Sequence, residues 1–383
     1  MIAECPVSVR LNPFKSEGVA LPILEGSRRV PWSPYGHILR ERPVFTLHPL
    51  FHAGLYYVQD SSAMYVGHVF RKNLPSGSGL RVLDLCAAPG GKTTDLCASL
   101  RLRCGDDFLL VSNEVMRDRV RALDDNVARW GDPNVTVTCA DPAAFACLEG
   151  YFDVIVADVP CSGEGMFRKD PRAEAEWSPA VVDLCAARQR RIIADVWPAL
   201  KQGGLLIYST CTYEDSENDA NLEWVADEMG GEIIPPEDEF PEEGVRVSRC
   251  GNLLKAGEVP GEGQWVGALR KTSPCGSVRG EGISALRPLR SGIVKGEVKG
   301  RELVPSQDWA LSISYDRSYP EAALDKQTAL RFLHRDSFAL PDAPLGFVAV
   351  TYKGVPLGFV KNLGKRCNNL LPLGRRILMD IKL

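Results

Sequence analysis

The sequence predicts an α/β protein built around a parallel sheet, with a short mixed region before it and a small β-rich module after it. Three patterns carry this prediction. From Leu80 onward, short apolar runs alternate with longer amphipathic segments, which is typical of βαβ units. The stretch Arg81–Thr94 has the pattern of a buried strand, a glycine turn and a helix start. Residues 271–300 are rich in Gly, Ser, Arg and Lys, as linkers often are.

The composition narrows the class of protein. The chain has 383 residues, enough for two or three domains, and 45% of them are hydrophobic, enough for a sizeable core. The net charge of −4 excludes a general basic field, so any nucleic acid must be bound by local basic patches. The start, Met1-Ile2-Ala3-Glu4, predicts no signal peptide, and no apolar run approaches the ~20 residues that span a bilayer. We therefore expect a cytoplasmic protein that binds no membrane.

The patterns divide the chain into four parts. We expect a mixed N-terminal region over residues 1–79, the α/β domain over 80–271, a linker over 272–325 and the β-rich module over 326–383.

In the N-terminal region, Ser8–Leu11 is predicted to be a strand, and four prolines then break the chain into short pieces. A helix is expected to start near Ser61. Tyr56 and Tyr57 could stack on a base, but core aromatics at a domain junction are the commoner case.

The α/β domain is expected to contain five parallel strands and a final strand that closes it. The apolar runs place these strands at residues 82–85, 108–112, 135–139, 152–157, 205–209 and 263–270. Helices are predicted over 117–130 and 181–200. The carboxyl ends of the parallel strands should meet at one edge of the sheet, where open α/β folds bind their ligands.

The loop after the first strand is the first candidate binding site. It consists of Cys86, Ala87, Ala88, Pro89, Gly90, Gly91 and Lys92. Gly90 and Gly91 let the backbone approach a ligand closely, but the loop has neither the GxGxxG nor the Walker spacing of phosphate sites. This favours a nucleoside-containing ligand without a phosphate, such as S-adenosylmethionine. An ordinary strand-to-helix turn is the alternative.

Acidic residues follow the next two strands. Glu114 ends the second strand, where an acid can bind the two ribose hydroxyls, although a solvated loop acid is the alternative. Asp141 follows the third strand and could contact an adenine amino group. Arg119, on the helix after the second strand, is expected to point back towards Glu114.

Two cysteines stand apart from the others. The twelve cysteines lack CxxC spacing and do not cluster with histidines, so we expect free thiols in a reducing compartment and no metal site. Cys161 and Cys211 each follow a central strand, next to the predicted cofactor loop. A lone cysteine is usually a small buried hydrophobe, but two at neighbouring strand ends suggest chemistry. A disulfide is the competing interpretation.

Methylation of a poor carbon nucleophile needs such a pair. Carbon 5 of cytosine becomes nucleophilic only after a thiolate has added to carbon 6. An acid at ring nitrogen N3 assists the addition, and Asp158 is placed for this role. A free thiol has a pKa near ~8.5, which Lys92 and nearby helix N-termini could lower.

The same residues carry a family resemblance. Three successive motifs resemble those of the Nop/Sun family of RNA (cytosine-5)-methyltransferases: CAAPGGKT, DVPCSGEGMFRKDP and YSTCTYEDSEN. The GEGMFRK extension resembles the bacterial F-type branch, which methylates 16S ribosomal RNA. The segments before and after the α/β domain also resemble that branch, which ends in a PUA-like RNA-binding module: GLYYVQDSSAM, KGRELVPSQDWAL and GFVKNLGKRCNNLLPLGRRI.

The resemblance implies a class I (Rossmann-like) S-adenosylmethionine-dependent methyltransferase domain and a role for each candidate residue. Cys211 would attack carbon 6, and Cys161 would assist product release. Lys92 and Asp158 would contact the target cytosine. The cofactor would be bound by Cys86 to Lys92, Glu114, Asp141 and Asp158, with Arg119 as a weaker candidate. DNA cytosine-5 methyltransferases use the cysteine of the Pro-Cys motif instead, and by that analogy the two thiols would exchange roles.

The resemblance also implies an RNA partner, 16S ribosomal RNA or the small subunit, and a monomer without metal. A transfer RNA methyltransferase and a non-catalytic ribosome-assembly factor are the rival functions. An amino-group methyltransferase would need a Pro-Pro-aromatic motif where the chain has Val159-Pro160-Cys161.

Two features of the ends of the chain bear on RNA binding. The family usually has a helical segment before the strand in SVRLNPFK, so the N-terminal RNA-binding region is expected to be shortened. The C-terminal segment is locally basic and is either a phosphate-backbone site or a solvated face: Lys361, Lys365, Arg366, Arg375 and Arg376.

Overall fold

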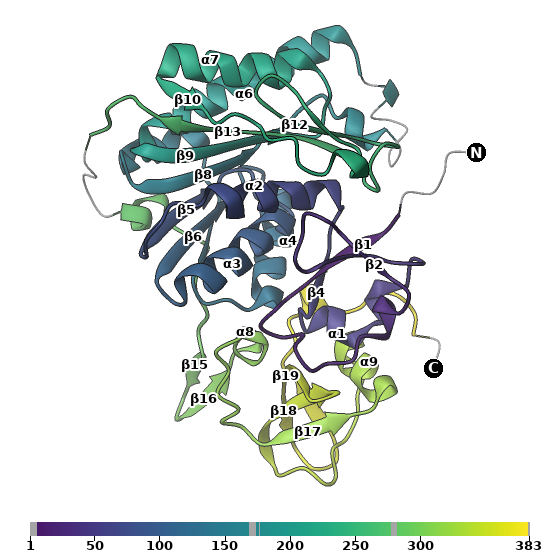
Figure 1. Cartoon of the computed structure of the whole chain (residues 1–383). Helices are drawn as coiled ribbons and strands as arrows, with labels where there is room; N and C mark the ends of the chain where they lie inside the picture. Colours follow the sequence, from purple (N-terminus) through teal and green to yellow (C-terminus); the bar gives the residue numbers. More distant parts are fainter. Residues whose placement is uncertain (1–5, 168–173, 176, 277–281, 382–383) are drawn as a thin grey trace.

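The computed structural model describes residues 6–167, 174–175, 177–276 and 282–381. Residues 168–171 of the DVPCSGEGMFRKDP motif and the start of the chain therefore lie outside the described residues. Figure 1 shows a large sheet with helices on both faces, and the N-terminal region and the C-terminal module lie together on one side of it.

The central sheet has the strand order β11-β12-β13-β9-β8-β5-β6-β7-β14, with β10 paired to β13. The pairs β9-β8, β8-β5, β5-β6 and β6-β7 are parallel, as predicted. The chain runs outward from β5 through β6 and β7, and then returns to the other side of β5 for β8 and β9. The ligand crevice of such a sheet lies where the strand order reverses, at the carboxyl ends of β5 and β8.

These strands are bounded as follows: β5 Leu80–Asp84, β6 Phe108–Asn113, β7 Val135–Thr138, β8 Phe152–Asp158, β9 Leu200–Thr210, β10 Gly231–Ile233, β11 Val245–Val247, β12 Gly251–Lys255, β13 Gly263–Lys271 and β14 Arg290–Ser291.

Strand β9 begins five residues earlier than predicted, because Gly203 and Gly204 lie inside the strand rather than before it. Gly203 has a φ of +76°, and the register between β8 and β9 shifts near Phe152. The preceding helix is correspondingly shorter than predicted. It ends at Val196, and Trp197–Ala199 forms a 3-10 turn around Pro198, which cannot donate a helical hydrogen bond.

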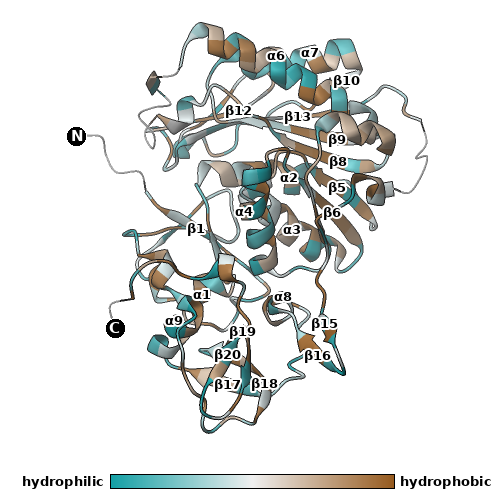
Figure 2. Ribbon diagram, turned by 180° about the vertical axis from the view of Figure 1, so that it is seen from behind, coloured by the Kyte–Doolittle hydropathy of each residue, from teal (hydrophilic) through white to brown (hydrophobic). Residues whose placement is uncertain are grey.

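Both faces of the sheet are buried by helices, which explains the continuous apolar runs of its parallel strands. One face is covered by α2 (Tyr65–Asn73), α3 (Gly91–Cys104) and α4 (Arg117–Trp130), and the other by α6 (Pro179–Val196) and α7 (Asp219–Met229). Figure 2 shows the hydrophobic strands enclosed between helices with hydrophilic outer faces. Helix α4 has the bounds predicted from the sequence.

The N-terminal region is anchored to the central domain by a buried arginine. It is an antiparallel sheet of β1 (Ser8–Leu11), β2 (Arg28–Arg29), β3 (Gly36–Ile38) and β4 (Tyr56–Val58), with the short helix α1 (Pro49–His52). Arg10 of β1 is fully buried and donates to Gly91 O (3.0 Å) and Thr94 Oγ1 (2.6 Å) at the start of α3. Strand β1 therefore supports the helix that follows the candidate cofactor loop.

The C-terminal module is a four-stranded sheet. It contains β17 (Glu321–Leu324), β18 (Gly346–Tyr352), β19 (Val355–Asn362) and β20 (Cys367–Asn369), with α9 (Lys326–His334). A hairpin at Lys353-Gly354 joins β18 to β19. Because β17 pairs with β18, we propose that the module starts ahead of Glu321. Between the domains lie β15 (Gly296–Lys299), β16 (Glu302–Pro305) and α8 (Gln307–Leu311).

The N-terminal region and the C-terminal module share one hydrophobic core. Val9 and Leu50 of the first pack in the same cluster as Phe332, Val348 and Val360 of the second. The core explains why the N-terminal region and the C-terminal module lie next to each other in Figure 1.

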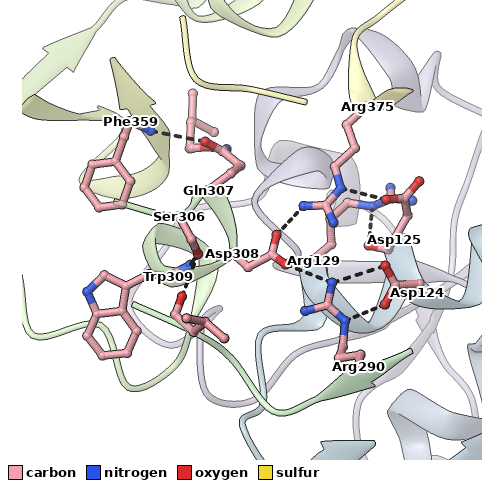
Figure 3. A network of polar contacts seen from close by, with 12 residues as sticks. Asp124, Asp125, Arg129, Arg290, Ser306, Gln307, Asp308, Trp309, Phe359 and Arg375 are labelled. Carbon is pink, nitrogen blue, oxygen red and sulfur yellow. Dashed lines mark hydrogen bonds and ion pairs between the residues drawn. The ribbon is translucent and has the colours of Figure 1, made fainter. Parts of the chain in front are cut away.

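The N-terminal region and the C-terminal module together form the outer part of the molecule. A network of ion pairs joins this outer part to α4 (Figure 3). Asp308 of α8 pairs with both Arg290 and Arg375, which are only 12% and 13% exposed. The same two arginines reach Asp124 and Asp125 of α4.

Candidate active site

The candidate cofactor loop is held from behind by α4. Arg119 donates to Ala88 O and Asn126 to Pro89 O, each at 2.7 Å. A Cβ on Gly90, which has a φ of +110°, would lie 3.3 Å from a methyl group of Leu123. The positive φ therefore favours glycine at this position, and the close contact with Leu123 would add to the cost of a larger residue.

Glu114 and Arg119 lie together, as the sequence predicted. Glu114 is 2% exposed, so it is not a solvated loop acid. Its Oε1 accepts from Met116 N (2.9 Å), and its Oε2 lies 3.3 Å from Arg119 Nη1. Asp141 is exposed after β7 and caps the following turn by accepting from Ala143 N (3.0 Å).

Asp84 is a candidate residue that the sequence reasoning missed. It ends β5, is fully buried and accepts from Thr93 Oγ1 through Oδ2 (2.6 Å). Burial raises its pKa to about 7, against the opposing effects of Thr93 and Lys92. The available signal was an acid inside the apolar run Val82-Leu83-Asp84-Leu85.

The two candidate cysteines meet at the carboxyl ends of neighbouring parallel strands. Cys211 directly follows β9, and Cys161 follows β8 after Val159 and Pro160. Their sulfur atoms are 3.0 Å apart, and Cys211 N lies 3.4 Å from Cys161 Sγ. An S–S bond measures about 2.05 Å, so the pair consists of two free thiols and not the alternative disulfide.

Lys92 and Asp158 form an ion pair next to the cysteines. Lys92 Nζ lies 2.8 Å from Asp158 Oδ2. The other oxygen, Asp158 Oδ1, accepts from Ser209 Oγ (2.8 Å) and Gln264 Nε2 (3.0 Å). Burial by itself lowers the pKa of Lys92, but Asp158 outweighs it and raises that pKa. Gln264 comes from β13, whose place beside β9 the sequence did not reveal.

The surroundings of the two thiols shift their pKa values in opposite directions. The hydrogen bond with Cys161 and the charge of Lys92 lower the pKa of Cys211, although burial and Asp158 oppose them. The pKa of Cys161 is raised well above its usual value by its hydrogen bond to Cys211 and by burial, and Glu217 adds to the rise. These directions favour Cys211 over Cys161 as the thiolate of the pair.

The crevice suits a cofactor that offers hydrogen-bond donors. Asp84 Oδ1 and Glu114 Oε2 are buried oxygens at neighbouring strand ends, and neither accepts a hydrogen bond from the described residues, although Glu114 Oε2 is ion-paired with Arg119 Nη1 at 3.3 Å. An amine and the hydroxyls of a ribose would satisfy such oxygens, which fits S-adenosylmethionine. Within the described ranges, no group of three or more His, Cys, Asp or Glu side chains could hold a metal ion.

Three family models match the chain in the expected order. The N-terminal domain of 16S rRNA methyltransferase RsmF matches residues 2–61, and 16S rRNA methyltransferase RsmB/F matches residues 74–229. The methyltransferase RsmF PUA domain matches residues 319–377. The resemblance to the RsmF-type methyltransferase family is confirmed.

Curated relatives agree with these matches. The ribosomal RNA small subunit methyltransferase F of Escherichia coli O7:K1 is 39% identical over 226 residues, which cover 57% of this chain and 46% of that protein. The protein of the same name from Escherichia fergusonii is 39% identical over 225 residues. The match thus spans about half the length of these relatives.

Solved structures support the fold. A methyltransferase homologue from Pyrococcus horikoshii has a TM-score of 0.57 and 26% identity, covering 70% of this chain and 87% of that one. The structure of NSun6 from Pyrococcus horikoshii with SFG has a TM-score of 0.56 and 18% identity, covering 70% of this chain and 91% of that one. The predicted Rossmann-like methyltransferase fold with a C-terminal PUA domain is confirmed. In the described part of the chain, no helix is long and apolar enough to span a membrane.

Proposed function

We propose that the chain, as a cytoplasmic monomer, transfers a methyl group from S-adenosylmethionine to carbon 5 of cytosine in 16S ribosomal RNA. The observation that carries the proposal is the position of Cys211, 3.0 Å from a second thiol and beside the Lys92–Asp158 pair. The curated relatives are named as methyltransferases of small-subunit ribosomal RNA, and the PUA match supports an RNA substrate.

The first step is the addition of the Cys211 thiolate to carbon 6 of a cytosine that has been flipped out of its stack. The electrons of the carbon 5–carbon 6 double bond move towards carbon 5 and N3. Asp158 and Lys92, which form an ion pair at 2.8 Å, would hydrogen-bond and protonate N3, and the proton would come from the Lys92 ammonium, directly or through Asp158. S-adenosylmethionine, when bound, supplies an electrophilic methyl group for the activated carbon 5.

The cofactor would be held by the loop from Cys86 to Lys92, together with Glu114, Asp141 and Asp158. Arg119 would contribute indirectly, because it fixes both Ala88 O and the Glu114 carboxylate. The buried oxygens of Glu114 and Asp84 would accept hydrogen bonds from the ligand.

Cys161 would complete the reaction as a base. While Cys211 is a free thiolate, its hydrogen bond and charge keep the proton on Cys161. Once Cys211 is bound to carbon 6, that charge is gone and Cys161 loses its proton more easily. Its thiolate, formed by release of a proton to solvent, can then remove the carbon 5 proton. The electrons of that C–H bond form the carbon 5–carbon 6 double bond, the carbon 6–sulfur bond breaks, Cys211 leaves as a thiolate, and N3 returns its proton to the Lys92–Asp158 pair.

The test is covalent trapping on RNA that contains 5-azacytidine, with S-adenosylmethionine present. The natural protein should form an adduct that survives denaturation. Cys211→Ala should form none, whereas Cys161→Ala should retain or accumulate it. Adduct formation by Cys211→Ala but not by Cys161→Ala would show that the thiols have exchanged roles.

The substrate needs its own experiment. Bisulfite sequencing of total RNA with and without the gene should reveal a cytosine in 16S ribosomal RNA that loses its protection in the deletion strain. A changed transfer RNA site would favour the transfer RNA alternative. No change in any RNA, together with no adduct, would favour the non-catalytic assembly factor.

A further inference from the structure

We propose that Glu217 is a positioning residue that ties the Cys161 loop to the Cys211 loop and keeps Cys161 as the protonated thiol of the pair. The inference rests on the proposed function, because it concerns the same two thiols. It assigns a role to a residue that lies six positions beyond Cys211 in the sequence and touches neither sulfur in the hydrogen-bond network.

Glu217 is linked by hydrogen bonds, directly or through Gln189, to the residues on both sides of Cys161. It lies in the 3-10 turn Asp215–Glu217 and is fully buried (0% exposed). Its Oε2 accepts from Ser162 N (3.1 Å) and from Gln189 Nε2 (2.7 Å). Gln189 Nε2 also donates to Pro160 O (2.9 Å). One carboxylate oxygen thus fixes the main chain just after Cys161 directly and just before it through Gln189.

The neighbouring residue, Asn218, makes hydrogen bonds to the residues on both sides of Cys211. Asn218 Oδ1 accepts from Thr210 Oγ1 (2.5 Å), and Asn218 Nδ2 donates to Thr212 O (3.0 Å). These two threonines flank Cys211. Two consecutive side chains, Glu217 and Asn218, therefore hold both cysteine loops from a single turn.

The hydrogen bonds that Glu217 accepts do not require its negative charge. Its second oxygen, Oε1, is buried and has no hydrogen-bond partner among the described residues. Burial raises the pKa of Glu217, whereas the hydrogen bonds from Ser162 and Gln189 lower it. A glutamine oxygen could accept both of those hydrogen bonds without the cost of a buried charge. A costly charge beside reactive groups is typical of a functional role.

The direction of the electrostatic effect follows from the groups around the thiols. The nearby titratable groups are Lys92, Asp158, Glu164, Glu214, Cys185 and Tyr208. Of these, Lys92 is the cation, and it lies on the Cys211 side, where it lowers the pKa of that thiol. Glu217 acts on Cys161, whose pKa it raises. The hydrogen bond between the two thiols is the main cause of the difference between their pKa values, and Glu217 adds to that difference on the Cys161 side.

The variant that separates charge from position is Glu217→Gln, which can keep both accepted hydrogen bonds and removes the charge. Glu217→Ala removes both. The matched control is Glu214→Gln, which removes the acid just before the same turn, an acid whose side chain makes no hydrogen bond to the described part of the Cys161 loop.

The experiment measures the rate of iodoacetamide alkylation at each cysteine of the full chain as a function of pH, with the sites resolved by mass spectrometry. The natural protein should react first at Cys211. In Glu217→Gln, Cys161 should react about tenfold faster near pH 7, as expected for a pKa lower by about one unit. Glu214→Gln should leave the ratio of the two rates unchanged. Unchanged profiles at both cysteines in Glu217→Gln would overturn the proposal.

A second measurement tests the positioning role. Glu217→Ala should lose most of the adduct with 5-azacytidine RNA, and Glu217→Gln should retain more of it, with thermal unfolding confirming that both variants fold. If Glu217→Ala does not fold, the Glu217→Gln profiles decide alone. Alkylation needs neither RNA nor cofactor. A shift at Cys161 without any adduct in the natural protein would therefore support the role of Glu217 while the proposed methyl transfer fails.

Discussion

Asp308 and Arg375 form an ion pair that joins α8 to the last turn of the C-terminal module (Figure 3). Through Nε, Arg375 also reaches Asp125 of α4 (2.7 Å), and the next residue of that helix, Asn126, donates to Pro89 O in the candidate cofactor loop. The C-terminal module and the loop are thus bound to consecutive residues of one helix.

Replacing Arg375 by glutamine should destabilise the protein by about 2 kcal/mol, because Asp125 then loses its charged partner in a partly buried site. Asp308 would keep Arg290, which limits the loss. Urea unfolding measures the effect. The control is Arg317→Gln just before β17, whose exposed pair with Glu321 should be worth less than about 1 kcal/mol. Equal losses in the two variants would show that the network contributes no more than a surface ion pair.

Lys92→Met should reduce the reactivity of Cys211. Lys92 lowers the pKa of this thiol, and its removal leaves the Asp158 charge, which raises that pKa, without its partner. We expect alkylation of Cys211 near pH 7 to slow by about tenfold or more, with normal rates restored at higher pH. Lys201→Met, which removes a lysine paired with Asp153, serves as control. An unchanged pH profile would mean that Lys92 does not activate the thiol.

Asp84 should make the stability of the protein depend on pH. The carboxyl group ionises near pH 4 in the unfolded chain but only near pH 7 in the folded protein. Its contribution is therefore fully present below about pH 4 and is lost as the pH rises to about 7, since only the unfolded chain gives up the proton in this window.

The Asp84→Asn variant has no carboxyl group to ionise at this position, so it does not lose this stability as the pH rises. Its unfolding free energy relative to the natural protein should rise between pH 4 and 7, by up to about 4 kcal/mol. Urea unfolding at pH 5 and pH 8 measures the difference, and the exposed Asp118→Asn on α4 should show almost none. A constant difference at the two pH values would exclude the raised pKa of Asp84.

Arg119→Met should weaken the binding of S-adenosylmethionine about tenfold. The side chain fixes Ala88 O and faces the Glu114 carboxylate, and a hydrogen bond to a charged group contributes about 1.5 kcal/mol or more. Calorimetric titration measures the affinity without any RNA. Arg117→Met removes an exposed arginine from the same helix and should leave the affinity unchanged. If both variants bind equally well, Arg119 does not support the loop.

The central domain could be predicted well because its strands are buried on both faces and its turns carry strong glycine signals. The helix 117–130 and the pairing of β8 with β9 follow directly from those patterns. Side chains that come from distant strands could not be predicted in this way. Gln264 reaches Asp158 only because β13 lies antiparallel to β9, and no local pattern specifies that pairing.

Burial explains the other residues that the sequence reasoning missed. Asp84 and Glu217 look like ordinary acids in the sequence, and only the packing of the sheet against α3 and α6 shows that both are shielded from water. By contrast, the two cysteines were found because their positions at strand ends follow from the order of the elements. The linker predicted over 272–325 contains β14, which adds to the central sheet beside β7 through only two residues, too short a strand to leave a pattern.

The shared core of the outer part has a consequence for how the chain folds during synthesis. Val9 and Leu50 leave the ribosome hundreds of residues before Phe332 and Val360, with which they pack. Closing such a long loop is slow, because its entropy cost comes before the contact provides any stabilisation. The central sheet can form while translation continues, but the first strands must wait for the last ones, with their apolar faces uncovered in the meantime.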